Sequence, residues 1–418
     1  MLNMNQELPL RSLAAHGHLP PAAAFPVSPI PLAPVLSGAA FRHQGQGAVR
    51  SVLDAGAVRH VTSGRVAIAL ALQQMGVGQG DEVLVPGYHC ASMVEPVTWS
   101  GARPVFYRVG ADTAVDLVDI AARLTPATRV LMATNYFGFP QPLEALRAFC
   151  DQHRLLLLED CAHSFLGEYR GRPLGAWGDY AIASSMKFYP VHEGGCLVSA
   201  QRSLATVALR SAGAGFEAKA AINMLEDGCA YGRLGALRWL LAVPLALKTM
   251  LWSRIKAGAP ARVRPLTPAS SEGGFAFDPA WLDIRASLLT RLMLRTVSRR
   301  RMGALRRRHY LRLRDALTGV AGCRPLLPEL PEGVYPWVFP LWVDQPQPVF
   351  LALKGMAVPV LRFGEYLSPE VSADTCPNSM ALSRHVMQFP CHQELRAAEL
   401  DWLIDRMRTA VMTATAAP

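Results

Sequence analysis

The sequence predicts an α/β protein with a mostly parallel β-sheet covered by helices on both faces. Three observations support this prediction. Near-continuous apolar runs of strand length recur along the chain, and stretches with helical spacing separate several of them. The 418-residue chain is also 51% hydrophobic, enough for a large core and more than one domain. The expected strands are "DEVLVPGY", "RPVFYRV", "TRVLMATNYF", "RLLLLED", "DYAIASS" and "GGCLVSA".

The expected helices alternate with these strands, as in "VAIALALQQMG" and "LEALRAFCDQH". In sheets of this kind, ligands bind at the carboxyl ends of the strands. Asp160 ends the apolar run "LLLLED", and Lys187 follows the strand "DYAIASS". We therefore expect Asp160 and the segment leading to Lys187 to lie at the same edge of the sheet.

Lys187 is a single lysine among apolar and aromatic residues in "SSMKFYPVHEGG". Taken alone, Asp160 is most simply a helix cap or a structural carboxylate. An acid at one strand end and an isolated lysine after another are together what pyridoxal 5'-phosphate (PLP) requires. The lysine condenses with the cofactor aldehyde, and the acid keeps the pyridine nitrogen protonated. The apolar neighbours of Lys187 should also lower its pKa, because burial disfavours the charged amine.

A phosphate anchor is predicted at Ser63, Gly64 and Arg65, which directly precede the helical run "VAIALAL". Backbone N–H groups at a helix N-terminus bind phosphate, and glycine allows the anion to approach closely. Most Ser-Gly pairs only cap helices, so this signal gains its weight from lying upstream of Asp160 and Lys187.

The combination of S-G, G-D-E-V-x-x-P, E-D-x-A, G-x-x-G-D and K-x(5)-E-G-G resembles the DegT/DnrJ/StrS-type sugar aminotransferases of PLP fold type I. The resemblance covers most of residues 59–200 well and the last third of the chain loosely. It implies a PLP-binding large domain with a mostly parallel central sheet, followed by a smaller C-terminal α/β domain.

The resemblance implies that Lys187 carries the cofactor and shuttles protons, and that Asp160 contacts the pyridine nitrogen. Gly64 and Arg65 would give backbone amides to the phosphate. The family often has glutamine where this chain has His163, which would touch the ring oxygen or stack on the ring.

Other positions depart from the family pattern. The usual phosphate-binding serine is replaced by Ile182, and we expect Ser184 to take over its role. The usual ring-stacking aromatic is replaced by Cys90, so that Tyr88 or His89 would stack instead. An asparagine–arginine pair that family members donate across the dimer has no clear match in "GGFAFDPAWLDIRAS".

We expect four regions: a Pro/Ala-rich N-terminal arm (1–45), the PLP-binding domain (46–215), a hydrophobic and basic insertion (216–271) and a small domain (272–418). The insertion contains "LGALRWLLAVPLALKTMLW" followed by "SRIKAGAPARVRP". Pro244 in the middle of this stretch disfavours a true membrane span. The insertion is either a buried helical hairpin or dimer-packing insert, or an interfacial element in which residues 234–256 lay Trp239 and Trp252 on a membrane beside basic side chains.

Composition limits the remaining possibilities. The formal net charge of +10 includes a dense arginine cluster between Arg285 and Arg314, whose spacing with Leu and Met predicts one or two helices with a solvated basic face. No nucleic-acid-binding motif accompanies it, so nucleic acid is not an expected partner. Eight dispersed cysteines without C-x-x-C pairs, and no signal-like segment in the first 25 residues, predict a cytoplasmic protein. No metal-binding motif is present.

The predicted function is transfer of an amino group, with glutamate as donor by resemblance, to a keto group of a nucleotide-linked deoxysugar used in polysaccharide or glycoconjugate biosynthesis. By resemblance the enzyme acts as a homodimer. One alternative is a PLP enzyme of another reaction type, or one with a lipid-linked or non-sugar acceptor. Lys187 favours transamination, because a histidine replaces it in the family's sugar 3-dehydratase branch. A non-catalytic PLP-fold scaffold at the membrane surface is the other alternative.

Overall fold

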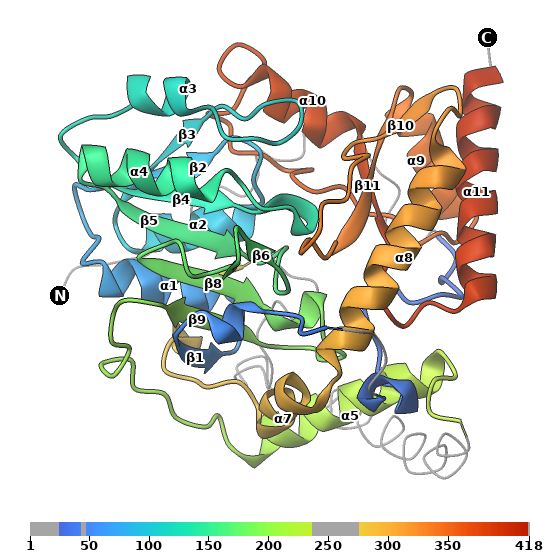
Figure 1. The fold of residues 1–418 in the computed structure, drawn as a ribbon, viewed down its shortest axis with the longest axis horizontal. Coiled ribbons are helices and arrows are strands. Elements are labelled where there is room, and N and C mark those ends of the chain that lie inside the picture. The colour runs from blue at the N-terminus through green and yellow to red at the C-terminus, as the bar shows by residue number, and fades with distance from the viewer. Residues whose placement is uncertain (1–24, 43–46, 236–275, 417–418) are drawn as a thin grey trace, which may run out of the picture.

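The computed structural model describes residues 25–42, 47–235 and 276–416. Its main feature is a seven-stranded sheet with the strand order β1-β9-β8-β5-β4-β2-β3 (Figure 1). Strands β3, β2, β4, β5 and β8 are parallel, whereas β9 is antiparallel to both of its neighbours. The strands are β1 (Ala57–Val61), β2 (Glu82–Pro86), β3 (Arg103–Tyr107), β4 (Thr128–Thr134), β5 (Leu156–Cys161), β8 (Tyr180–Ser184) and β9 (Gly195–Ser199).

The helices that cover this sheet are α1 (Gly64–Gln74), α2 (Ala91–Trp99), α3 (Leu117–Ala122) and α4 (Leu143–His153). The chain moves outward from β2 to β3 through α2, then back to β4 and β5 through α3 and α4. Because such crossovers are right-handed, helices that follow opposite directions lie on opposite faces. Accordingly α1 and α2 pack together on one face, and α3 and α4 lie on the other.

A second core lies around a three-stranded antiparallel sheet with the order β10-β11-β12. Its strands are β10 (Cys323–Pro325), β11 (Val338–Val343) and β12 (Val386–Pro390), and a two-stranded ribbon elsewhere pairs β6 (Glu168–Tyr169) with β7 (Arg172–Pro173). The remaining helices are α5 (Ala214–Ala230), α7 (Leu288–Thr296), α8 (Arg299–Leu317), α9 (Pro346–Gly355), α10 (Pro377–His385) and α11 (Ala397–Ala416). In Figure 1, α8, α9 and α11 lie together beside the smaller sheet.

The predicted α/β architecture is confirmed, and each of the six expected strands is present. The strand β1 was not foreseen. Its sequence "AVRHV" is mixed in character, and its pairing with β9 defines it as a strand.

The arginine cluster forms the two helices α7 and α8, as predicted. The expectation of a fully solvated basic face is wrong for Arg301 and Arg306, which are buried. Arg301 pairs with the equally buried Glu394, and Arg306 donates to carbonyl oxygens. Helical periodicity alone does not reveal that distant segments of the chain cover the side of α8 that carries Arg301 and Arg306.

The N-terminal region is described from residue 25 to residue 42, where Ile30 is buried in the second core. His392 Nε2 contacts the Pro31 carbonyl oxygen at 3.0 Å. The predicted membrane-contacting segment 234–256 lies outside the described residues except for its first two positions. Within the described part of the chain, none of the helices has the length and apolar character needed to cross a bilayer.

Candidate active site

One edge of the seven-stranded sheet gathers the predicted site. The carboxyl ends of β4, β5 and β8 meet there because these strands are parallel neighbours. Strand β1 is antiparallel to β9, which is antiparallel to β8, so β1 also ends at this edge. From there the chain passes through Ser63 into α1. The topology therefore brings a helix N-terminus, Asp160 and Lys187 to one edge, as the sequence predicts.

Asp160 lies near the end of β5 with 2% of its surface exposed. Its Oδ1 accepts a hydrogen bond from the Ala162 N–H at 2.9 Å, and its Oδ2 accepts one from Thr134 Oγ1 at 3.1 Å. Burial raises the pKa of Asp160, and the Ala162 N–H, the nearby Lys187 amine and the Thr134 hydroxyl act in the opposite direction. Its carboxylate is thus held in one orientation, close enough to Lys187 for electrostatic interaction.

Glu159, the residue before Asp160, has a structural role. Its fully buried carboxylate accepts hydrogen bonds from the backbone N–H groups of Gly175 (2.8 Å), Trp177 (3.2 Å) and Gly178 (3.4 Å). The E-D motif and the G-x-x-G-D motif are therefore two halves of one hydrogen-bonded unit. This unit fixes the loop before β8 and, through it, the strand that leads to Lys187.

Lys187 ends a short 3-10 turn, η6 (Ser185–Lys187), directly after β8. Its ammonium nitrogen Nζ lies 4.4 Å from the centre of the Trp337 ring. Burial lowers the pKa of Lys187, while Cys90 and Asp160 favour the charged form and Arg65 disfavours it. The reduced pKa gives a larger fraction of neutral, nucleophilic amine at neutral pH than an exposed lysine has.

The N-terminus of α1 offers backbone N–H groups to an anion. The Ser63 hydroxyl caps the helix by accepting from the Val66 N–H at 3.3 Å. A Cβ built on Gly64 would meet no atom nearer than 3.8 Å, and the closest atom is Cβ of Ser184. Ser184 thus faces the helix end, as expected for a residue that replaces the missing serine at Ile182. Its side chain forms no hydrogen bond with the residues described.

Gly195 explains why the E-G-G motif ends in glycine. A Cβ at this position would lie 2.4 Å from the backbone carbon of Ser63 and 2.7 Å from the backbone nitrogen of Gly64. Both distances are shorter than real Cβ contacts. Only glycine lets β9 pass this closely behind the helix N-terminus.

Arg65 follows Gly64 in the first turn of α1 and is partly buried. Its Nη1 donates to the Ala276 carbonyl oxygen at 2.7 Å. Burial lowers the pKa of Arg65, and Glu95 and Cys90 partly offset this effect. The guanidinium adds positive charge near both the helix N-terminus and Lys187.

Aromatic side chains form one wall beside Lys187. The His163 ring packs against three aromatic rings, with ring centres 4.1 Å apart for Trp337, 4.8 Å for Phe363 and 6.1 Å for Phe137. Burial and the neighbouring Lys187 hold the pKa of His163 well below its usual range, so its imidazole is neutral. The Phe137 N–H points at Nδ1 of His163 at 3.5 Å. This contact leaves Nε2 as the protonated nitrogen, able to donate a hydrogen bond.

The two candidates for ring stacking lie differently. Tyr88 is fully buried against Phe363 and Tyr136, and its hydroxyl has no hydrogen-bond partner among the residues that the structure describes. His89 stacks on Phe106, and the Ser368 N–H donates to its Nε2 at 3.0 Å. Tyr88 therefore joins the aromatic wall through Phe363, whereas one face and the Nε2 atom of the His89 ring are already engaged.

Sequence reasoning missed Trp337, Phe363 and Arg306. The first two contact the site from segments more than 130 residues after Lys187, with no local motif to identify them. Arg306 belongs to the arginine-rich helix and donates to the Lys187 carbonyl oxygen at 3.1 Å. In the sequence it is the first of three consecutive arginines, and no local signal separates it from its solvated neighbours.

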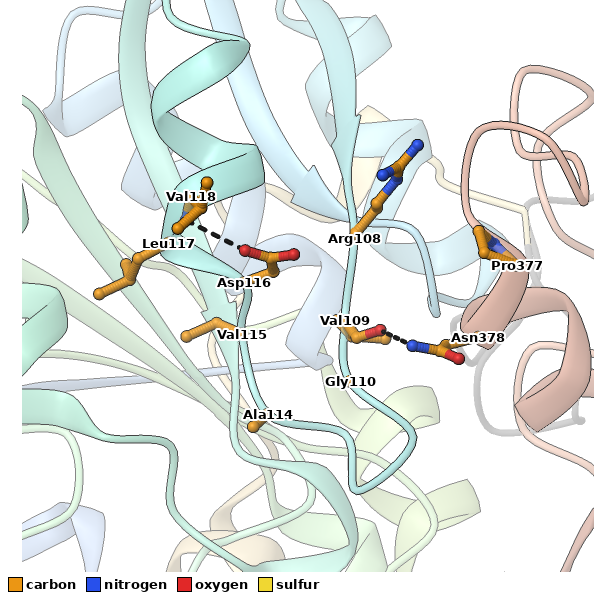
Figure 2. A pocket seen from close by; sticks show the side chains of 10 residues that line it. All are labelled: Arg108, Val109, Gly110, Ala114, Val115, Asp116, Leu117, Val118, Pro377 and Asn378. Carbon is orange, nitrogen blue, oxygen red and sulfur yellow. Dashed lines mark hydrogen bonds between the residues drawn. The ribbon is translucent and has the colours of Figure 1, made fainter.

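A separate cavity of about 570 Å³ lies at the carboxyl end of the edge strand β3, beside α3 and α10 (Figure 2). Four interstrand steps separate β3 from β8, which corresponds to about 19 Å at a strand spacing of about 4.8 Å. The cavity contains none of the predicted site residues. It is lined by Arg108, Val109, Gly110, Ala114, Val115, Asp116, Leu117, Val118, Pro377 and Asn378.

Comparison with known families agrees with this geometry. Residues 47–234 match the family described as the DegT/DnrJ/EryC1/StrS aminotransferase family. The chain is 34% identical to the GDP-perosamine synthase of Vibrio cholerae over 148 residues. This aligned stretch covers 34% of this chain and 40% of that protein. It is 37% identical over 137 residues to the dTDP-3-amino-3,4,6-trideoxy-alpha-D-glucose transaminase of Streptomyces venezuelae, covering 32% of this chain and 35% of that protein. The matched parts thus span well under half of these two relatives.

Solved structures extend the likeness over most of the chain at low identity. The aminotransferase TlmJ from Streptoalloteichus hindustanus is 20% identical, with a TM-score of 0.60 and coverage of 86% of this chain and 87% of that one. 3-Amino-5-hydroxybenzoic acid synthase is 21% identical, with a TM-score of 0.60 and coverage of 87% and 88%. The expected aminotransferase fold is therefore confirmed.

Proposed function

We propose that this chain, whose residues 47–234 match the DegT/DnrJ/EryC1/StrS aminotransferase family, is a PLP-dependent aminotransferase. The observation that carries the proposal is the meeting of Lys187, Asp160 and the N-terminus of α1 at one sheet edge. An amine of lowered pKa, a buried oriented carboxylate and a helix N-terminus that can bind phosphate are the three groups that PLP requires of a protein. If Asp160 were only a structural carboxylate and Lys187 only a surface lysine, the two side chains would have no reason to lie together at this edge.

The residues present fit this cofactor. No atom lies nearer than 3.8 Å to a Cβ built on Gly64, the side chain of Ser184 lies beside this helix end, and Gly195 keeps the strand behind it close. We assign the phosphate to the backbone amides of Gly64 and Arg65, with Ser63 and Ser184 beside it. Asp160 would hold the pyridine nitrogen.

When bound, PLP supplies an electron-accepting ring that labilises the proton on the carbon bearing the amine. Lys187 is the group placed to move that proton, because its lowered pKa lets it serve as base and then as acid near neutral pH. Neutral His163 would donate from Nε2 to the ring oxygen, a contact that a charged imidazole in this buried position would make only at a desolvation cost. Tyr88 supports the aromatic wall through Phe363.

For the substrates, we propose glutamate as amino donor and a nucleotide-linked deoxysugar as acceptor. Glutamate would become 2-oxoglutarate, and the keto carbon of the acceptor would become an amine-bearing carbon. The names of the two relatives support the sugar acceptor, since both describe nucleotide-linked amino sugars. Trp337 is placed to contact a sugar ring, because its indole faces Lys187 and is only partly buried.

We further propose a cytoplasmic homodimer. All eight cysteines lie within the described residues and none is paired, which suits a reducing compartment. The family resemblance supports the dimer. Peripheral membrane contact through residues 234–256 is a separate hypothesis. Co-sedimentation with anionic liposomes, comparing the full chain with one lacking residues 234–252, tests it, and equal sedimentation would contradict it.

The deciding experiment is an absorbance spectrum of the protein with PLP, before and after addition of glutamate. We expect a visible band that glutamate bleaches as the amino group moves to the cofactor. Lys187→Ala should lack the responsive band. Lys354→Ala is the matched control, since Lys354 lies on α9 against Phe350 and should leave the spectrum unchanged. A wild-type protein that takes up no PLP would contradict the proposed function.

A further inference from the structure

Arg306 on α8 has a completely buried guanidinium group. Its Nε donates to Gln393 Oε1 at 2.9 Å, and its Nη1 donates to the carbonyl oxygens of Pro336 and Trp337, both at 3.0 Å. Its Nη2 donates to the carbonyl oxygen of Lys187 at 3.1 Å. One side chain thus connects three segments that are distant in the sequence.

The partners of Arg306 are neutral oxygens. Burial lowers its pKa to about 10, so the group still carries its charge at neutral pH. Burying a charge without a carboxylate partner is costly unless several hydrogen bonds compensate. Here the guanidinium also stacks over the Phe188 ring at 4.3 Å, and Gln393 Nε2 donates to the Phe188 carbonyl oxygen at 2.9 Å. The arrangement is therefore directed at the backbone of residues 187 and 188.

Trp337 is held from both sides. Its backbone N–H donates to the Phe137 carbonyl oxygen at 2.8 Å, and its backbone carbonyl oxygen accepts a hydrogen bond from Arg306. The same guanidinium holds the Lys187 carbonyl, while the two side chains meet with Nζ 4.4 Å from the indole centre. The separation of Lys187 and Trp337 is thus set through one shared guanidinium group, whose Nη1 holds the Trp337 carbonyl and whose Nη2 holds the Lys187 carbonyl.

We infer that Arg306 is a positioning residue that fixes the Lys187 side chain against Trp337 by holding both backbone carbonyls at once. The inference rests on the proposed function, because it concerns the lysine that would carry the cofactor. Arg306 acts through Lys187 and Trp337 and has no assigned contact with cofactor or substrate.

Loss of this contact would let Trp337 and the Lys187 turn separate and admit water to Nζ. Besides Asp160, the groups that act on Lys187 electrostatically are Cys90, Arg65 and His163, and none of them depends on Arg306 for a hydrogen bond described here. Burial is the largest cause of the lowered Lys187 pKa. Hydration of Nζ should therefore raise this pKa towards the ordinary value for lysine.

Arg301 provides a matched control on the same helix. It is also buried, donates to the Gln393 carbonyl oxygen at 3.1 Å and pairs with Glu394. It has no hydrogen bond to Lys187 or Trp337 among the contacts described. If Arg306 served only stability, loss of either arginine would have the same kind of effect.

The test is competitive acetylation of the protein freed of cofactor, with Lys187 modification measured by mass spectrometry relative to Lys354. At neutral pH we expect Arg306→Met to reduce relative Lys187 labelling about tenfold, which corresponds to a rise of about one pKa unit. Arg301→Met should lower thermal stability but leave this ratio unchanged. Arg306→Lys keeps the charge but cannot span the same carbonyls, so a smaller decrease is expected.

An unchanged ratio in Arg306→Met, or an equal decrease in Arg301→Met, would overturn the positioning role. If Arg306→Met does not fold, a wild-type ratio in Arg306→Lys would overturn it equally. A PLP spectrum of the wild-type protein is recorded in parallel. A wild-type protein that binds PLP while Arg306→Met keeps its labelling ratio contradicts the positioning role alone. A wild-type protein that binds no PLP contradicts the proposed function, and the positioning role with it.

Discussion

Glu193, in the E-G-G motif six residues after Lys187, should make the stability of this protein depend on pH. Its carboxyl group is fully buried, and its Oε1 accepts from the Ser287 N–H at 3.1 Å and from Ser287 Oγ at 2.8 Å. Burial raises the pKa of Glu193 to about 7, with a smaller contribution from Glu217, and hydrogen bonds from Thr290 and Ser287 oppose the rise. In the unfolded chain the pKa of this carboxyl group returns to its ordinary value of 4.5.

The sign follows from proton binding. Between pH 4.5 and 7 the folded protein holds this proton and the unfolded chain does not, so the contribution is present below pH 4.5 and lost as the pH rises through 7. A difference of about 2.5 pKa units corresponds to about 3.4 kcal/mol in total. About 2.5 kcal/mol of this should be lost between about pH 5 and about pH 8.

Urea unfolding of the wild type and Glu193→Gln over this pH range isolates the effect, because other titrating groups contribute equally to both. We expect the free energy of unfolding of Glu193→Gln to gain about 2.5 kcal/mol relative to the wild type as the pH rises across that range. Ser287→Ala should steepen the pH dependence, since it removes a hydrogen bond that favours the ionised carboxylate. Parallel stability curves for Glu193→Gln and the wild type would refute the reasoning.

Three further predictions concern the site. Glu159→Gln should lower the free energy of unfolding by about 2–4 kcal/mol in urea titrations, because an amide NH₂ would then face backbone donors such as the Gly175 or Trp177 N–H. The exposed Glu144→Gln should change it by less than about 0.5 kcal/mol, and an equal loss in both would contradict the assignment. Gly195→Ala should weaken PLP binding at least about tenfold in a fluorescence titration, because the added Cβ overlaps the backbone of Ser63. Gly355→Ala, whose Cβ would meet nothing within 4 Å, should bind PLP normally, and similar affinities in the two variants would count against the phosphate site. Asp160→Asn should keep the cofactor but slow its bleaching by glutamate about a hundredfold or more, as measured by stopped-flow absorbance, because a neutral amide does not stabilise the protonated pyridine. A wild-type rate would contradict the role of Asp160.

Prediction from the sequence was most complete where the physical signal is local. Fully buried strands read as continuous apolar runs, so β2, β4, β5 and β8 were identifiable without any knowledge of their partners. Parallel order then placed Asp160 and Lys187 at the same edge. The weaker strand β1 was missed, because its partly exposed residues carry no such pattern.

The arginine-rich helix shows where local reasoning ended. Periodicity identified α8 as a helix, but it could not tell which arginines would be covered by β11 and by the segment before α11. Arg301 and Arg306 are buried by residues that lie far along the chain. A charged residue in a helix is solvated in most proteins, so only the tertiary contacts reveal these exceptions.

The sequence by itself determined the α/β class, the strand ends that present Asp160 and Lys187, and the glycine-bearing helix N-terminus, because each depends on residues adjacent in the chain. The tertiary structure alone decided the placement of Trp337 beside Lys187, of Phe363 beside His163, and the burial of Arg306 behind Lys187. These contacts join segments separated by more than 100 residues, and their energies depend on packing and desolvation. Neither packing nor desolvation exists until the two cores come together.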